Sequence, residues 1–325
     1  MEASSLQQYT SNTTISRVLL SAGVLLVLWN NYIMPIPETI QWIFFAATIL
    51  MAGIPHGALD HIVAKQNSNL QNHSFSNTRF YLTYVSRMAL YGICWYFFPS
   101  FALLVFIVLS AFHFGETDLP LPISIHKRSA IVLQTNYGLL IVLVLLLTHA
   151  QEVLSILTII EKENKVLLTA IFKPLHSTLI ILILFSLLIL NFIWQYRSHR
   201  LPLRRYVNIA FRTLLILGII ICLPLPLAFA FYFGCWHSLQ SLENIRQHLS
   251  NSGSEHISFT HLLQKCIPFS LLAFIGIGVL TFLATYLQTA SVFLFFFFVG
   301  IAILTAPHLE VMSDMYEHLR KKEYK

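Results

Sequence analysis

The chain has 325 residues, of which 56% are apolar and only 10% are charged. Soluble domains carry about 25% charged residues, and an apolar surplus of this size exceeds what one water-soluble core can bury, so much of it must face lipid. The composition excludes a soluble enzyme, a nucleic-acid-binding module and a disordered chain, and the net charge of +6 is expected to set membrane orientation rather than to recruit a polyanion.

Apolar segments long enough to cross a bilayer recur along the whole chain. A transmembrane helix needs about 20 apolar residues. In chain order, the ten predicted spans are 16–34, 40–61, 80–98, 100–116, 129–148, 166–193, 207–223, 226–245, 267–287 and 290–306. Pro99 and the stretch Leu223–Pro226 separate two pairs of short spans, which predicts helical hairpins because proline interrupts the helix backbone.

These segments predict an all-α fold, a polytopic transmembrane helical bundle of about ten spans. The polar loops near 62–79 and 246–266 are too short to form a core of their own. We therefore expect one integral-membrane domain over residues 1–325, with a short polar N-terminal segment at 1–15 and a basic C-terminal tail at 316–325.

The distribution of Lys and Arg gives an independent indication of topology. With both termini on one side, the opposite side receives only Lys162 and Lys165, while Arg87, Lys173 and Arg212 fall within spans. The side of the termini receives Arg17, Lys65, Arg79, Lys127, Arg128, Arg197, Arg200, Arg204, Arg205, Arg246, Lys265, Arg320, Lys321, Lys322 and Lys325. The positive-inside rule then predicts cytoplasmic termini in a multi-pass protein of the cell (inner) membrane.

Four histidines lie at or near the C-terminal ends of even-numbered spans. They are His56, His113, His237 and His308. Because every even-numbered span runs toward the cytoplasm in this topology, the four are expected at a similar depth on one side. An ionisable side chain at membrane depth is a functional candidate, although a single histidine there is more often an interfacial residue. Neutral imidazoles from several helices of a bundle can build a site for iron, copper or zinc.

Two acids accompany these histidines at helical spacing. Asp60 follows His56 by four residues, and Glu116 follows His113 by three, so each acid shares a helix face with its histidine. A carboxylate on the same helix or a neighbouring one can accept the second ring N–H of a metal-bound histidine. We expect Asp60 and Glu116 in this supporting role, and Gly57, Gly115 and Gly234 are expected to permit close helix approach.

The motifs Pro55-His56-Gly57-Ala58-Leu59-Asp60-His61, Phe112-His113-Phe114-Gly115 and Trp236-His237-Ser238, followed by Pro307-His308, resemble those of the Brp/Blh family of membrane β-carotene 15,15′-dioxygenases. The resemblance implies cleavage of β-carotene by O₂ at the central double bond, giving two molecules of all-trans-retinal, and a functional link to a microbial rhodopsin. It also implies an Fe(2+) cofactor with His56, His113 and His237 as ligands, and no catalytic side chain beyond the metal centre. A long polyene would need a tunnel lined by apolar side chains near the metal.

The sequence departs from the family pattern at one position. The third motif of the family usually has a second histidine four residues after the first, where this chain has Ser241. Serine is a poor iron ligand, so His308 completes the site, or three histidines hold the metal, or activity is lost. Two further interpretations stay open: a non-catalytic carotenoid- or retinal-binding membrane protein in rhodopsin biogenesis, and another histidine-ligated membrane oxidoreductase.

Overall fold

The computed structural model describes residues 13–121, 125–160, 165–198, 202–250, 257–286 and 290–322, and within these ranges it contains helices and no strands. Three segments, labelled η2 to η4, are π-helical. In chain order, the elements are α1 (Thr13–Leu28), η2 (Trp29–Ile33), α2 (Glu38–Thr48), η3 (Ile49–Gly53), α3 (Ile54–Gly57), α4 (Asp60–Leu70), α5 (Asn77–Phe97), α6 (Pro99–Asp118), α7 (Lys127–Thr148), α8 (Ala150–Ile160), α9 (Lys165–Ile171), α10 (Pro174–Arg197), α11 (Leu203–Cys222), α12 (Leu225–Phe229), η4 (Ala230–His237), α13 (Ser238–Ser250), α14 (Phe259–Tyr286) and α15 (Ala290–Lys322).

Each predicted span coincides with helical structure, and seven helical stretches of the described chain are long and apolar enough to cross a membrane. The polytopic helical bundle is therefore confirmed, while the count of ten spans and the side of the termini stay predictions. Both predicted proline breaks are present: α5 ends at Phe97 before Pro99, and α11 ends at Cys222 before α12. The predicted span 166–193 is instead divided between α9 and α10, because Pro174 begins a new helix.

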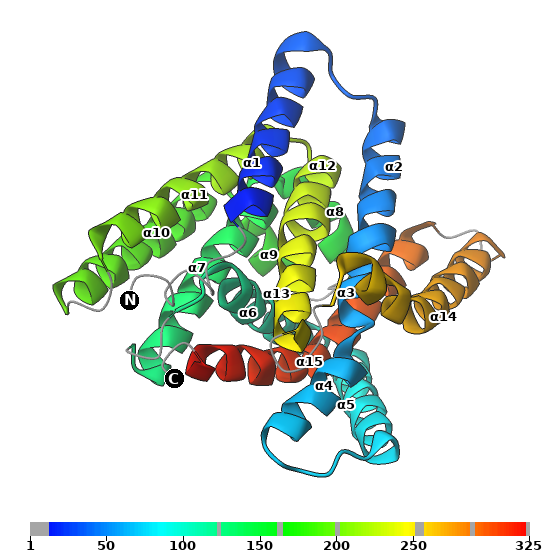
Figure 1. The fold of residues 1–325 in the computed structure, drawn as a ribbon. Coiled ribbons are helices and arrows are strands. Elements are labelled where there is room, and N and C mark those ends of the chain that lie inside the picture. Colours follow the sequence, from blue (N-terminus) through cyan, green and yellow to red (C-terminus); the bar gives the residue numbers. More distant parts are fainter. Residues whose placement is uncertain are drawn as a thin grey trace.

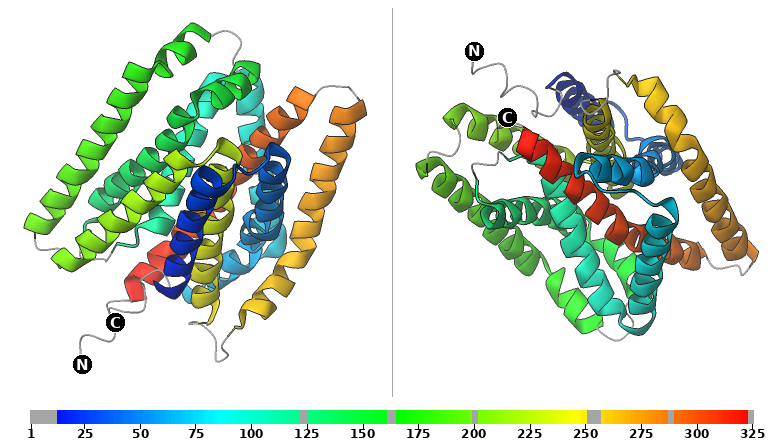
Figure 2. Two further views of the ribbon diagram at one scale, coloured as in Figure 1. Left: turned by 90° about the horizontal axis from the view of Figure 1, so that it is seen from above. Right: turned by 60° about the horizontal axis from the view of Figure 1, so that its bottom comes forward.

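Helix α7 lies at the centre of the largest apolar core, where it packs against α6, α10 and α11 (Figure 2). Its contact with α6 is so close that only glycine fits at two positions. A Cβ atom on Gly115 would lie 1.8 Å from the carbonyl oxygen of Gln134, and one on Gly138 would lie 1.7 Å from that of Ala111. This close approach fixes the end of α6, which carries His113.

The long helix α15 contacts α4, α5, α6, α13 and α14, and it crosses the lower part of the bundle in Figure 1. Ion pairs join it to two neighbours: Arg87 of α5 pairs with Glu310, and Lys127 of α7 lies 2.7 Å from Glu317. Lys127 and then Lys321 lower the pKa of the Glu317 carboxyl to about 2. The packing of α15 against α4 and α6 places His308 in the interior.

Candidate metal centre

The structure brings the four span-end histidines together in one cluster. His56 comes from α3, His113 from α6, His237 from the end of η4 and His308 from α15. Their exposed fractions are only 5%, 3%, 0% and 7%, respectively. The ring centroid of His308 lies 5.0 Å from that of His56 and 4.9 Å from that of His113. The ring of His237 lies 4.8 Å from His113 and 5.5 Å from His56.

The nitrogen atoms of this cluster can hold a metal ion. One ring nitrogen each of His56, His113 and His308 lies within 4.8 Å of the other two. Within the described part of the chain, no hydrogen-bond partner is found for either ring nitrogen of His113 or His237, for Nδ1 of His56, or for Nε2 of His308. Buried polar atoms without partners are costly, and a metal ion would satisfy one nitrogen on each ring that binds it. Neutral imidazoles suit iron, copper and zinc.

Asp60 supports the cluster through a histidine of another helix. Its Oδ1 atom lies 2.7 Å from Nδ1 of His308, and the Tyr84 hydroxyl donates to its Oδ2 at 2.8 Å. The helix is interrupted between α3 and α4, at Ala58 and Leu59, so His56 and Asp60 do not share one regular helix face. Sequence spacing alone pointed to His56 as the partner, and it gave no signal for Tyr84.

Glu116 lies near the cluster without an observed contact to an imidazole ring. Its Oε1 atom accepts a hydrogen bond at 3.1 Å from the Ser313 hydroxyl of α15. Glu116 was expected to accept a ring N–H from a histidine of its own helix or of a neighbouring one, and no such hydrogen bond is found among the described residues. Glu116 thus joins α6 to α15 one helical turn beyond the cluster.

One π-helical segment precedes a histidine of the cluster, and another ends at one. η3 ends at Gly53, three residues before His56, and η4 ends at His237. The two segments pack against each other, and a Cβ atom on Gly234 would lie 2.5 Å from Thr48. π-Helical turns frequently occur at functional sites. Here they shift the register of both helices just before a candidate ligand.

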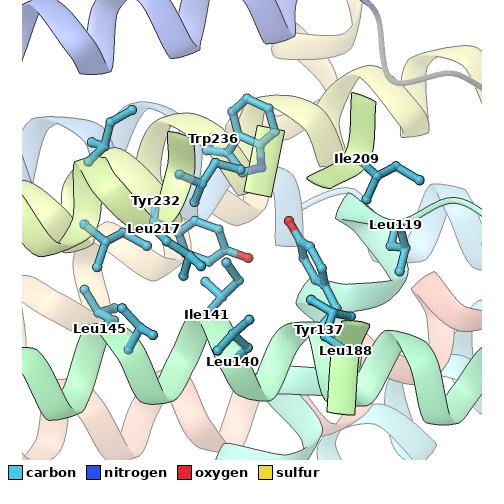
Figure 3. Close-up of a cluster of buried hydrophobic side chains, with 14 of the residues drawn as sticks. Leu119, Tyr137, Leu140, Ile141, Leu145, Leu188, Ile209, Leu217, Tyr232 and Trp236 are labelled. Carbon is cyan, nitrogen blue, oxygen red and sulfur yellow. The ribbon is translucent and has the colours of Figure 1, made fainter. Parts of the chain in front are cut away.

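A buried polar network surrounds Asp118 at the end of α6, and it includes Tyr232 and Trp236 of η4, the segment that ends at His237. The Tyr232 hydroxyl donates to Oδ2 of Asp118 at 3.0 Å, and the Tyr137 hydroxyl makes a longer bond of 3.5 Å to the same atom. Arg212 donates to the Asp118 carbonyl oxygen and lies 5.7 Å from the Trp236 ring. Figure 3 shows the polar atoms of Tyr137, Tyr232 and Trp236 converging from two sides. The network joins α6, α7, α11 and η4, and it was not predicted from the sequence, although Arg212 within a span was a signal for it.

The fold and the site together define a polytopic membrane protein with a buried four-histidine cluster. The family model of β-carotene 15,15′-dioxygenase matches residues 47–316, a range that includes all four histidines, and the chain belongs to this family. Among curated proteins, the β-carotene 15,15′-dioxygenase of uncultured marine bacterium 66A03 is 25% identical over 282 residues, which cover 85% of this chain and 94% of that protein. No solved structure matches the chain.

Proposed function

We propose that this protein cleaves β-carotene at its central 15,15′ double bond with O₂ and releases two molecules of all-trans-retinal. The reaction needs no other reductant, because both atoms of O₂ are used: each half of the substrate receives one oxygen atom. The observation that carries the proposal is the buried cluster of four imidazoles in a chain of the β-carotene 15,15′-dioxygenase family.

The proposed cofactor is Fe(2+), held by His56, His113, His237 and His308. Bound iron would supply the redox chemistry that activates O₂. His308 is the best candidate for the fourth ligand, since its ring lies beside those of His56 and His113. Ser241, at the position where the family usually has a histidine, is fully buried in α13.

The chain itself contributes positioning and exclusion of water. Asp60 accepts the Nδ1 proton of His308, which leaves Nε2 free to face the other rings. The packing of α3, α6, η4 and α15 keeps all four rings buried. We propose no general acid or base, because neither atom transfer to the two alkene carbons nor product release requires a proton.

The location of the site suits a substrate dissolved in lipid. β-Carotene and O₂ both partition into the bilayer, so a site within a helical bundle can receive them from the side. We further propose a single domain over residues 1–325 in the cell (inner) membrane, with cytoplasmic termini, and a role in supplying retinal to a microbial rhodopsin.

Expression in a bacterium that accumulates β-carotene tests the proposal. The wild-type protein should bleach the orange cells and leave retinal in the extract, and the purified protein should contain about one iron atom per chain. Purification with bound pigment but without iron or retinal would instead identify a carotenoid-binding protein. An intense Soret band would identify a haem protein.

A further inference from the structure

A row of aromatic rings leads away from the histidine cluster along α2, α12 and η4. Phe233 stacks on His237 with ring centroids 5.9 Å apart. From Phe233 the row continues to Phe229 at 5.4 Å, to Phe45 at 5.5 Å and to Trp42 at 5.5 Å. We call Phe233, Phe229, Phe45 and Trp42 the aromatic row. The backbones that carry it are in contact, since α2 packs against both α12 and η4 (Figure 1).

The rings of the row keep accessible surface, although the cluster at its inner end is buried. Phe233, Phe229 and Phe45 are half-buried, and Trp42 at the outer end is 39% exposed. On the other side of η4, Phe231 and Tyr232 are buried in the core. The rings of the row are therefore less buried than the histidine cluster that it leads to.

The composition and length of the row suit a polyene. From Thr39 to Pro55 and from Leu223 to Trp236 the chain has no charged residue, and the outer end is marked by the Trp42 indole, which donates to Glu38 at 3.2 Å. Three ring-to-ring steps of 5.4 to 5.9 Å lead from His237 to Phe45. The length of this path is comparable with the distance from the central double bond of β-carotene to its terminal ring.

We propose that the aromatic row binds one arm of β-carotene, with the central double bond beside the histidine cluster and the terminal ring toward Trp42. This inference rests on the proposed function and assigns the path of the substrate within it. Phenyl rings in contact with a conjugated chain contribute dispersion and stacking energy. The row would also set the register of the substrate, because the rigid arm ends in a bulky ring that stops near Trp42.

Binding can be measured apart from turnover with full-length protein under anaerobic conditions, where no cleavage occurs. β-Carotene is achiral, so its visible circular dichroism on titration reports the protein-bound fraction. Phe45→Ala and Phe229→Ala remove rings of the row without altering a histidine or a residue stacked on one. Each should raise the dissociation constant about five- to tenfold, the equivalent of one lost aromatic contact. In air, each should raise KM by a similar factor and leave kcat within about twofold.

Phe211→Ala is the matched control, because Phe211 is a 63% exposed ring on α11 outside the row. It should bind β-carotene as the wild type does. If an alanine variant does not fold, Phe45→Leu and Phe229→Leu keep apolar volume and should still weaken binding. Unchanged binding by row variants of a protein that makes retinal would overturn the inference alone. A wild-type protein that makes no retinal would overturn the proposed function instead.

Discussion

His308 decides whether the proposed metal site has three or four histidine ligands. It reaches the cluster from α15 and is held there by Asp60, whose second oxygen is in turn held by Tyr84. A histidine whose Nδ1–H is fixed by a carboxylate presents Nε2 in one orientation, as histidines bound to metals commonly do. The residue therefore combines the burial, orientation and free nitrogen expected of a ligand.

His308→Ala should abolish both iron binding and retinal formation, because it removes one of four donors. Ser241→Ala should change iron content and activity less than twofold, since the proposed ligand set does not include the hydroxyl. Metal analysis of the purified variants, together with retinal extracted from carotene-producing cells, provides the measurement. Normal iron content in His308→Ala, or its loss in Ser241→Ala, would contradict the ligand set.

Asp60→Asn should weaken iron retention about 10- to 100-fold, the cost typical of losing a carboxylate that supports a metal-bound histidine. Tyr84→Phe removes one hydrogen bond to that carboxylate and should have a smaller effect in the same direction. Iron retention in both variants can be measured by competition with a chelator. Tyr81→Phe is a suitable control, because Tyr81 stacks on Phe269 away from the cluster. Equal iron retention in Asp60→Asn and wild type would exclude the supporting role.

At the scale of elements, the site depends on two close helix contacts. Gly115 and Gly138 let α6 and α7 approach until their backbones touch, and Gly234 lets η4 lie against Thr48 at the end of α2. The backbones of α6 and η4 cannot shift at these contacts without moving a histidine. Gly115 is two residues from His113, and Gly234 is three from His237. Helix packing through small residues is common in membranes, and here it fixes the positions of α6 and η4, which carry His113 and His237.

Gly138→Ala should destabilise the protein by about 1–3 kcal/mol or more, the usual cost of overpacking, because the added methyl would overlap the Ala111 carbonyl oxygen. It should also lower iron retention by displacing α6. Gly218→Ala on α11 is the matched control, since no atom lies within 4 Å of its added Cβ. Thermal unfolding in detergent compares the two. A melting temperature of Gly138→Ala equal to that of Gly218→Ala would show that the α6–α7 contact can adjust without cost.

At the scale of the whole molecule, the predicted spans place the site near one end of the bundle rather than at its middle. The four histidines are at or near the ends of predicted spans, and α15 crosses beneath the helices that contribute the other three (Figure 1). In the proposed topology this end faces the cytoplasm, where most of the basic residues lie. Retinal would therefore be formed close to the inner leaflet.

Fusion reporters can test this orientation. Green fluorescent protein fused to either terminus should fluoresce, and alkaline phosphatase fused there should be inactive, because the charge distribution predicts cytoplasmic termini. A phosphatase fusion within the loop that contains Lys162 and Lys165 should be active. Active phosphatase at one terminus only would require an odd number of spans and would contradict the proposed topology.

The sequence alone predicts the helical membrane class, the helix breaks at Pro99 and near Leu223, and four histidines near the ends of predicted spans. These features follow from properties that are local or additive along the chain: apolar length, proline chemistry and the placement of charge. The family resemblance came from short motifs that include His56, His113 and His237, and the family comparison confirmed it.

Only the tertiary structure decided which side chains meet. Asp60 contacts His308 rather than His56, Glu116 contacts Ser313, and Phe45 joins a row begun by Phe233. Each of these contacts links segments distant in sequence, and each depends on how the helices are rotated against one another. Spacing along a sequence predicts neighbours only on an unbroken helix, so the partners at this site follow from how the helices pack.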